Sequence, residues 1–278
     1  MLAGPGAVWG LVAAAVVSVV AHRAGALTLG GAVAATAVGG IVFGWGGVQA
    51  ALPLLFFFVT GTALSRWQQG RKVHRLEHND HKGRRAGQVL ANGAVAALAI
   101  GGGALWPGPV WWAAFGGAIA AATADTWATE FGVLARRAYL ITTGALAPPG
   151  RSGAVSGQGT AAGALGATSV AALVAGVGAL GGNPFGLAMA WPSAWQAVAA
   201  AAAAGGIAGM LVDSLLGATV QERFFCRACG RETEARIHRC GTRTERLGGW
   251  PGVNNDIVNF CATLAGALTA ALLYWVLA

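Results

Sequence analysis

Eight long apolar stretches constrain this chain more than any other feature of its sequence. Each is close to the ~20 residues that an α-helix needs to cross a bilayer. They run roughly over Ala3–Ala21, Ala26–Gly46, Val48–Ser65, Ala86–Leu105, Val110–Leu134, Gly159–Leu180, Ala194–Val220 and Val253–Leu277. The pattern predicts an all-α, polytopic integral membrane protein: one helix bundle of about eight transmembrane helices over residues 1–278. Because the connection between the second and third stretches is so short, either of these could be tilted or re-entrant.

The composition agrees with a membrane-embedded chain. Only 10% of the residues are charged and the mean hydropathy is +0.60, whereas a typical soluble domain carries about 25% charged residues. The 45 glycines fit helices that pack closely in lipid, because small residues let helix backbones approach one another.

All 18 Lys and Arg residues fall in alternate loops, on one side of an eight-span bundle. By the positive-inside rule this side faces the cytoplasm of an inner-membrane protein, and both termini are extracytoplasmic. The net charge of +8 then follows from topology and does not point to a nucleic acid polymer. The loops on the other side contain Trp106, Trp111, Trp112, Trp191 and Trp195, which predict an aromatic belt at the membrane interface.

Four carboxylates interrupt or border the apolar stretches, where an acidic residue costs about 2.5–3.5 kcal/mol at a helix centre. They are Asp125 and Glu130 in the fifth stretch, Asp213 in the seventh and Asp256 at the start of the eighth. All are expected within about two helical turns of the cytoplasmic surface. Converging carboxylates repel one another, so Asp125, Asp213 and Asp256 predict an Mg²⁺ site, the alternative being a proton or Na⁺ pathway.

Neutral polar residues accompany these acids at similar depth. Thr129 shares a helix face with Asp125, whereas Glu130 diverges from Asp125 by about 140° and is expected to serve another part of the site. The asparagines that we expect in the same site are Asn92, Asn254, Asn255 and Asn259.

The predicted cytoplasmic loop over residues 135–158 is rich in glycine and hydroxyl residues, within "ITTGALAPPGRSGAVSGQGT" (Ile141–Thr160). Glycines free backbone N–H groups to bind anions, and hydroxyl groups donate to phosphate oxygens. The loop matches neither a P-loop nor a dinucleotide fingerprint, and a plain linker is the alternative. Its candidate phosphate-binding residues are Thr142, Thr143, Gly144, Ser152, Gly153 and Ser156.

A second predicted cytoplasmic loop, residues 221–252, contains "CRACGRETEARIHRC". Cys226, Cys229, His238 and Cys240 are soft ligands with the spacing C-x₂-C-x₈-H-x-C, which suits a structural Zn²⁺ ion. A reducing compartment makes disulfides unfavourable, and reduced thiols without metal are the alternative. Cys261, in the last apolar stretch, is interpreted as a packing residue.

Five segments together resemble the transmembrane protein nineteen family, a former domain of unknown function that includes the plant phytyl-phosphate kinase of tocopherol synthesis. The resemblance covers most of the chain from about residue 30. The segments are "GRRAGQVLANG" (Gly83–Gly93), "DTWATEFG" (Asp125–Gly132), the Gly-rich loop, "VDSLLGATVQ" (Val212–Gln221) and "NNDIVNF" (Asn254–Phe260).

The resemblance implies a membrane kinase that transfers a phosphoryl group from a nucleoside triphosphate, CTP being the expected donor, to an isoprenoid monophosphate such as phytyl or geranylgeranyl phosphate. Mg²⁺ bound by the aspartates would neutralise charge, and Arg84 and Arg85, in the basic loop 66–85, would clamp phosphate oxygens. Two alternatives stay open: a CTP-dependent lipid cytidylyltransferase that uses the same metal site, and an ion-coupled transporter that uses the intramembrane aspartates.

Overall fold

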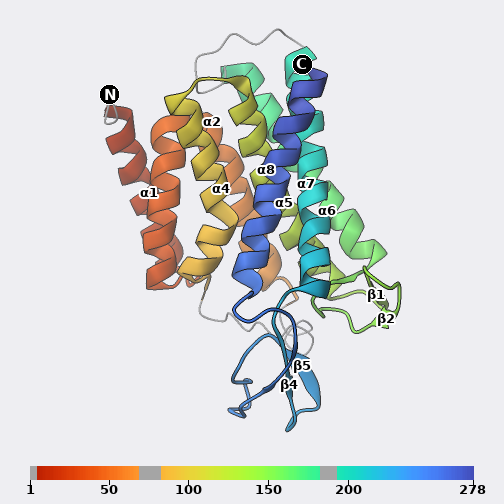
Figure 1. Cartoon of the computed structure of the whole chain (residues 1–278). Helices are drawn as coiled ribbons and strands as arrows, with labels where there is room; N and C mark the ends of the chain where they lie inside the picture. Colours follow the sequence, from red (N-terminus) through yellow and green to blue (C-terminus); the bar gives the residue numbers. More distant parts are fainter. Residues whose placement is uncertain (1–4, 69–82, 182–192) are drawn as a thin grey trace.

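Seven long α-helices form one bundle in the part of the chain that the computed structural model describes, residues 5–68, 83–181 and 193–278 (Figure 1). They are α1 (Pro5–Arg23), α2 (Leu29–Arg66), α4 (Ala86–Leu105), α5 (Pro109–Gly132), α6 (Gly157–Gly181), α7 (Ser193–Thr219) and α8 (Asn255–Leu277). Six of these helices, all except α5, are long and apolar enough to cross a membrane. The prediction of a polytopic helical membrane protein is confirmed. Several residues on which the predicted topology rests lie outside the described residues: Arg71, Lys72, Arg75, Lys82 and Trp191.

Helix α2 contains both the second and the third predicted spans. At 38 residues a straight helix would be about 57 Å long, far more than the ~30 Å hydrocarbon core. Gly47 interrupts it with a left-handed φ of 60° and a ψ of −162°, a conformation open to glycine. The two ends of α2 lie near each other. Arg66 Nη2, at the last residue of the helix, donates to the carbonyl oxygen of Ala24 at 2.7 Å, and Ala24 is four residues before the N-cap Thr28. The chain therefore folds back at Gly47.

Helix α5 lies at the centre of the bundle, in contact with α2, α4, α6, α7 and α8. Its residues from Trp112 to Ala124 are all buried. Pro109 begins the helix at a position where its missing N–H costs nothing. Because its neighbours shield it from lipid, α5 tolerates a polar segment at its C-terminal end.

Glycines bring α5, α7 and α8 into close contact. A methyl group on Gly117 of α5 would meet the carbonyl oxygen of Gly266 on α8, and one on Gly209 of α7 would meet Ala121 of α5. Such close approach is typical of small-residue interfaces in membranes. Gly209 is one turn before Asp213, so this contact holds the Asp213 face of α7 against α5.

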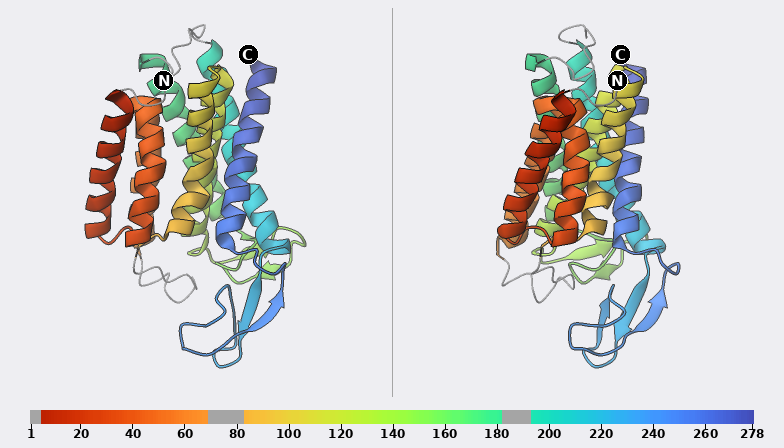
Figure 2. Two further views of the ribbon diagram at one scale, coloured as in Figure 1. Left: turned by 60° about the vertical axis from the view of Figure 1, so that its left-hand side comes forward. Right: turned by 90° about the vertical axis from the view of Figure 1, so that its left-hand side faces the viewer.

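Two small antiparallel sheets lie in the predicted cytoplasmic loops 135–158 and 221–252. The first has strand order β2-β1-β3, with β1 Ala138–Leu140, β2 Leu146–Ala147 and β3 Ala154–Val155. The second has order β5-β4-β6, with β4 Arg223–Cys226, β5 Arg231–Thr233 and β6 Glu245–Gly248. Both sheets lie at one end of the bundle, opposite the start of α1 and the end of α8 (Figures 1 and 2). We call this the sheet end.

The prediction of an aromatic belt is wrong for two of its residues. Trp112 is fully buried and donates through Nε1 to the carbonyl oxygen of Val174 at 3.3 Å. Trp195 is also buried and packs against Gly178. Both tryptophans fill space between helices, and at Trp195 the absent side chain of Gly178 leaves room for the indole ring. Trp106, by contrast, is exposed.

Candidate functional site

A cavity of about 880 Å³ lies at the sheet end, between the helix termini and the two small sheets. Its wall contains six arginines and five carboxylates: Arg84, Arg136, Arg151, Arg223, Arg231 and Arg239, with Asp125, Glu130, Asp213, Glu232 and Glu234. Carboxylates of this kind bind cations, and guanidinium groups bind phosphates. The cavity therefore offers partners for both charges of a metal–phosphate complex.

Asp125 and Asp213 meet in this cavity from two different helices. Asp125 is near the C-terminal end of α5 and Asp213 in the last two turns of α7, and both line the cavity close enough for the charge of Asp125 to act on Asp213. Asp213 Oδ2 is buried with no hydrogen-bond partner in the described structure. An orphaned buried oxygen of this kind indicates a missing ligand. The sequence prediction that these two residues converge agrees with this placement.

Glu130 lies in the same cavity, near the half-buried Arg84. Its Oε1 accepts a hydrogen bond of 2.6 Å from Ser65 Oγ on α2, and it acts electrostatically on Arg84. Glu130 is five residues, about 1.4 turns, after Asp125, and both line the wall. Glu130 therefore holds the Arg84 side of the cavity to α2, in agreement with its expected place in a different part of the site.

Arg84 is fixed in position by both its backbone and its side chain. Its N–H donates to Ala26 and its carbonyl oxygen accepts from Thr28. Its guanidinium group lies 5.1 Å from the ring centre of Phe57 and 5.5 Å from that of Phe58. Burial lowers the pKa of Arg84 to about 10, and the charge of Glu130 opposes this shift. An immobilised, weakly hydrated guanidinium group is a strong partner for a phosphate oxygen.

The predicted polar residues Thr129, Asn92, Asn255 and Asn259 also line the cavity. Asn92 donates through Nδ2 to the carbonyl oxygen of Gln88 at 2.9 Å. Helices α4, α5 and α8 thus each contribute neutral oxygen or amide groups beside the two aspartates.

The second half of the Gly-rich loop forms part of the wall, from Pro148 to Ser156. Gly153 has a φ of 76°, and a methyl group there would collide with the backbone of Ala218 on α7. Ser156 Oγ accepts a hydrogen bond of 3.1 Å from Gly159 N and so caps the start of α6. The N-terminus of α6, at Gly159 and Thr160, faces the cavity and adds the positive end of a helix dipole.

The second sheet closes the cavity through ion pairs that the sequence did not indicate. Glu232 Oε2 lies 3.0 Å from Arg151 Nε and 3.6 Å from Arg223 Nη1. Glu234 accepts a short hydrogen bond from Ser152. Sequence reasoning missed these residues because they are distant in the chain, and a charged pattern in a hydrophilic loop usually indicates only solvation. Sequence reasoning also missed Gln221, whose buried Nε2 has no hydrogen-bond partner in the described structure.

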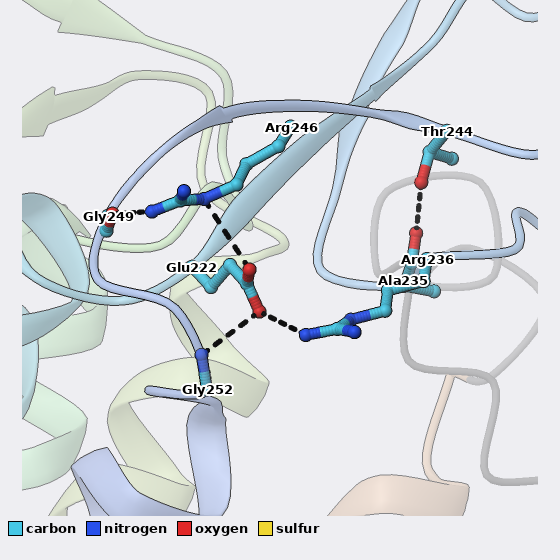
Figure 3. Close-up of polar contacts among 7 residues, drawn as sticks. All are labelled: Glu222, Ala235, Arg236, Thr244, Arg246, Gly249 and Gly252. Carbon is cyan, nitrogen blue, oxygen red and sulfur yellow. Dashed lines mark hydrogen bonds and ion pairs between the residues drawn. The ribbon is translucent and has the colours of Figure 1, made fainter.

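Glu222 anchors this sheet to the bundle, at the point where the chain leaves α7 (Figure 3). Its Oε2 lies 3.2 Å from Arg236 Nη2 and accepts from Gly252 N at 3.4 Å, and its Oε1 lies 3.4 Å from Arg246 Nε. The Glu222 N–H donates to the carbonyl oxygen of Val253. One buried carboxylate therefore ties the sheet to the start of α8.

Six residues that the sequence nominated do not line the cavity. They are Asp256, Arg85, Thr142, Thr143, Gly144 and Asn254. The carboxyl group of Asp256, in the first turn of α8, lies against Gly87 of α4 instead. Arg85 is the exposed N-cap of α4, and Asn254 caps α8 by accepting from Ile257 N at 3.1 Å. Thr142–Gly144 form the exposed turn between β1 and β2.

A small apolar pocket of about 80 Å³ adjoins the cavity between α1, α2 and α4. Four residues belong to both walls: Phe57, Arg84, Gln88 and Asn92. The rest of the pocket is mostly aliphatic and aromatic, including Val17, Val38, Phe43 and Leu54. A charged group at Arg84 could therefore carry an apolar chain into the bundle.

The four predicted zinc ligands lie together outside the cavity wall. The ligand atoms of Cys226, Cys229, His238 and Cys240 are all within 4.8 Å of one another. Hydrogen bonds with Thr242 and His238 lower the pKa of the Cys240 thiol to about 5.

The fold and these motifs agree with what comparison with known proteins finds. The family described as "Integral membrane protein DUF92" matches residues 12–267, and the chain belongs to this family. It is 35% identical over 144 residues to the "uncharacterized membrane protein MJ0933" of Methanocaldococcus jannaschii, covering 49% of this chain and 57% of that protein. The chain thus aligns with little more than half the length of this relative. No solved structure matches the chain.

Proposed function

We propose that this protein is an Mg²⁺-dependent membrane kinase that phosphorylates an isoprenoid monophosphate to the diphosphate, with a nucleoside triphosphate as donor and CTP as the first donor to test. The observation that carries the proposal is one cavity in which two facing aspartates and a half-buried arginine adjoin an apolar pocket. The phosphate of the acceptor would lie near Arg84, and the first part of its tail would enter the pocket between α1, α2 and α4. The pocket is small, so the remaining chain would lie in lipid.

The donor set of the cavity fits Mg²⁺. Asp125 and Asp213 face each other, Asp213 Oδ2 has no partner among the described residues, and Asn255 and Asn259 supply neutral oxygens nearby. Mg²⁺ prefers one or two carboxylates together with substrate phosphates. When bound, it would neutralise charge on the triphosphate.

The residues of the chain would act mainly by positioning. A phosphate oxygen of the acceptor attacks the γ-phosphorus, the bond from that phosphorus to the β,γ-bridging oxygen breaks, and a nucleoside diphosphate leaves. Arg84 would hold the acceptor, while Arg151 and the Gly153 backbone, with the start of α6, would hold the donor. The acceptor is already an anion near neutral pH, so the transfer needs no strong general base.

Two labels in one assay test this function. Purified protein in detergent receives Mg²⁺, geranylgeranyl or phytyl phosphate, and CTP labelled at either the γ or the α phosphorus, with ATP, GTP and UTP in parallel. The kinase predicts γ label in a prenyl diphosphate. Label from the α position in a CDP-lipid would instead establish the cytidylyltransferase. No lipid label from any nucleotide, in protein that stays folded, would exclude both and favour the ion-coupled transporter.

The proposed orientation places the cavity at the cytoplasmic face of the inner membrane. Its support is the arginine-rich sheet end together with the positive-inside rule. Cysteine-accessibility labelling in intact cells tests it: a cysteine introduced at Thr143, on the exposed β1–β2 turn, should stay unreactive toward a membrane-impermeant reagent until the membrane is opened.

A further inference from the structure

The Cys/His cluster in the loop 221–252 has the composition and spacing of a closed metal site. Cys226 Sγ and Cys240 Sγ are 3.6 Å apart, close to the ~3.8 Å expected between two sulfur ligands of a tetrahedral Zn²⁺ ion with Zn–S bonds of about 2.3 Å. His238 Nδ1 is 3.0 Å from Cys240 Sγ. From this geometry we propose that Cys226, Cys229, His238 and Cys240 bind one structural Zn²⁺ ion.

The backbone brings the ligands together through two similar turns. Gly230, directly after Cys229, has a φ of 63°, and its N–H donates to the carbonyl oxygen of Cys226 at 2.9 Å. Gly241, directly after Cys240, has a φ of 81°, and its N–H donates to the carbonyl oxygen of His238 at 2.8 Å. In each turn a left-handed glycine lets the chain reverse right after a ligand, so two pairs of ligands face one centre.

A disulfide explains this arrangement less well than a metal ion. A disulfide would use two of the three thiols and would give His238 no reason to approach the cluster. His238 and Cys226 are both buried, in a loop with few buried side chains to enclose them. Four protein ligands with no position left for water are typical of structural zinc, not of catalytic zinc.

The ion would fix the wall of the cavity. Cys226 ends β4, and the turn to β5 leads directly to Glu232 and Glu234, which pair with Arg151 and Ser152 of the Gly-rich loop. The strands of this sheet are three or four residues long, too short to be stable through their own packing. A metal cross-link supplies stability that such a small core lacks.

Metal content tests the proposal directly. The full chain is purified in detergent through a tag without histidines and without chelator, and the zinc content of the monodisperse fraction is measured by mass spectrometry. We expect about one Zn²⁺ per chain, as for a closed four-ligand site. Cys229→Ser and Cys240→Ser should each lose the ion. Cys261→Ser, in α8 and away from the cluster, is the matched control and should keep it.

Chelation of the wild-type protein provides a second readout that needs no variant. Removing the ion should expose the three loop thiols to a thiol reagent and accelerate tryptic cleavage within 221–252, while helical circular dichroism stays unchanged. The proposal is overturned if folded wild-type protein contains no zinc, if Cys229→Ser and Cys240→Ser retain as much zinc as Cys261→Ser, or if chelation leaves the cleavage rate unaltered. None of these readouts uses the kinase assay, so a failure of the proposed function leaves this test intact.

Discussion

Asp125 and Asp213 line one cavity, close enough for the charge of one carboxyl group to act on the other, although 88 positions separate the two residues in the chain. The absent side chain of Gly209, one turn before Asp213, lets α7 approach Ala121 of α5 and so brings the two aspartates together. Two ionised carboxylates this close repel one another unless a proton or a cation lies between them. Their pairing is therefore the strongest reason to expect a cation in the cavity.

Replacing either aspartate should abolish the proposed activity. Asp125→Asn and Asp213→Asn each remove a charge from the cation site, and we expect kcat to fall by about 10²-fold or more, as when a group that stabilises transition-state charge is lost. Asp256→Asn is the matched control, because Asp256 lies against Gly87 outside the cavity wall. The measurement is the initial rate of lipid diphosphate formation against Mg²⁺ concentration. An Asp256→Asn enzyme as impaired as Asp125→Asn would show that the structural assignment of the ligands is incorrect.

Substitutions of the neighbouring residues Arg84 and Arg85 should differ sharply in their effect on the KM for the lipid phosphate. Arg84→Gln is expected to raise the KM for the lipid phosphate about 10–100-fold, the effect of losing a charged hydrogen bond worth ~1.5–3 kcal/mol. Arg84→Lys should restore only part of the affinity, because an ammonium group lacks the planar fork. Arg85→Gln should leave the KM unchanged, since Arg85 is exposed at the N-cap of α4. Equal effects at both positions would indicate general electrostatic attraction and no defined contact at Arg84.

Two glycines of the Gly-rich loop provide a test of its position. Gly153 and Gly144 both have positive φ values, 76° and 67°, so alanine costs about 1–2 kcal/mol of backbone strain at either. Only at Gly153 would the new methyl group also collide with Ala218 of α7. We expect Gly153→Ala to lower kcat/KM for the nucleotide at least about tenfold, since small misplacements of binding groups are costly. Gly144→Ala should have little effect. Similar kinetics for the two variants would contradict a role of this wall in binding the donor.

The anchoring role of Glu222 predicts a local loss of stability. Glu222→Gln removes the charge that Arg236 and Arg246 share, in a side chain that is only 9% exposed. Tryptic cleavage within 221–252 should then become about tenfold faster, because proteolysis follows the population of the opened segment. Glu245→Gln is the control: its ion pair with Arg227 is exposed on both sides, and such pairs contribute little. An unchanged cleavage rate in Glu222→Gln would show that the zinc site or packing alone holds the sheet.

Periodic features of the chain were readable from the sequence. Long apolar stretches, rare internal charges and the loop positions of Lys and Arg predicted a helical membrane bundle, because a bilayer imposes a length and a polarity on every span. Asp125 and Asp213 were recognisable for the same reason: a carboxylate in an apolar helix is costly and needs a partner. The spacing of Cys226, Cys229, His238 and Cys240 was visible as a local motif.

Only the tertiary structure decided which side chains meet. It turned α2 back at Gly47, buried Trp112 and Trp195 in the bundle, and brought Glu232 and Glu234 to the Gly-rich loop. It also placed Arg84, Asn255 and Asn259 in the cavity wall and left Arg85 and Asp256 out of it, although these residues are close in sequence. Depth along a helix follows from counting residues, but the direction of a side chain around the helix axis depends on how neighbouring helices pack. That packing is set by contacts between residues far apart in the chain, such as Gly209 with Ala121, and no local pattern in the sequence encodes it.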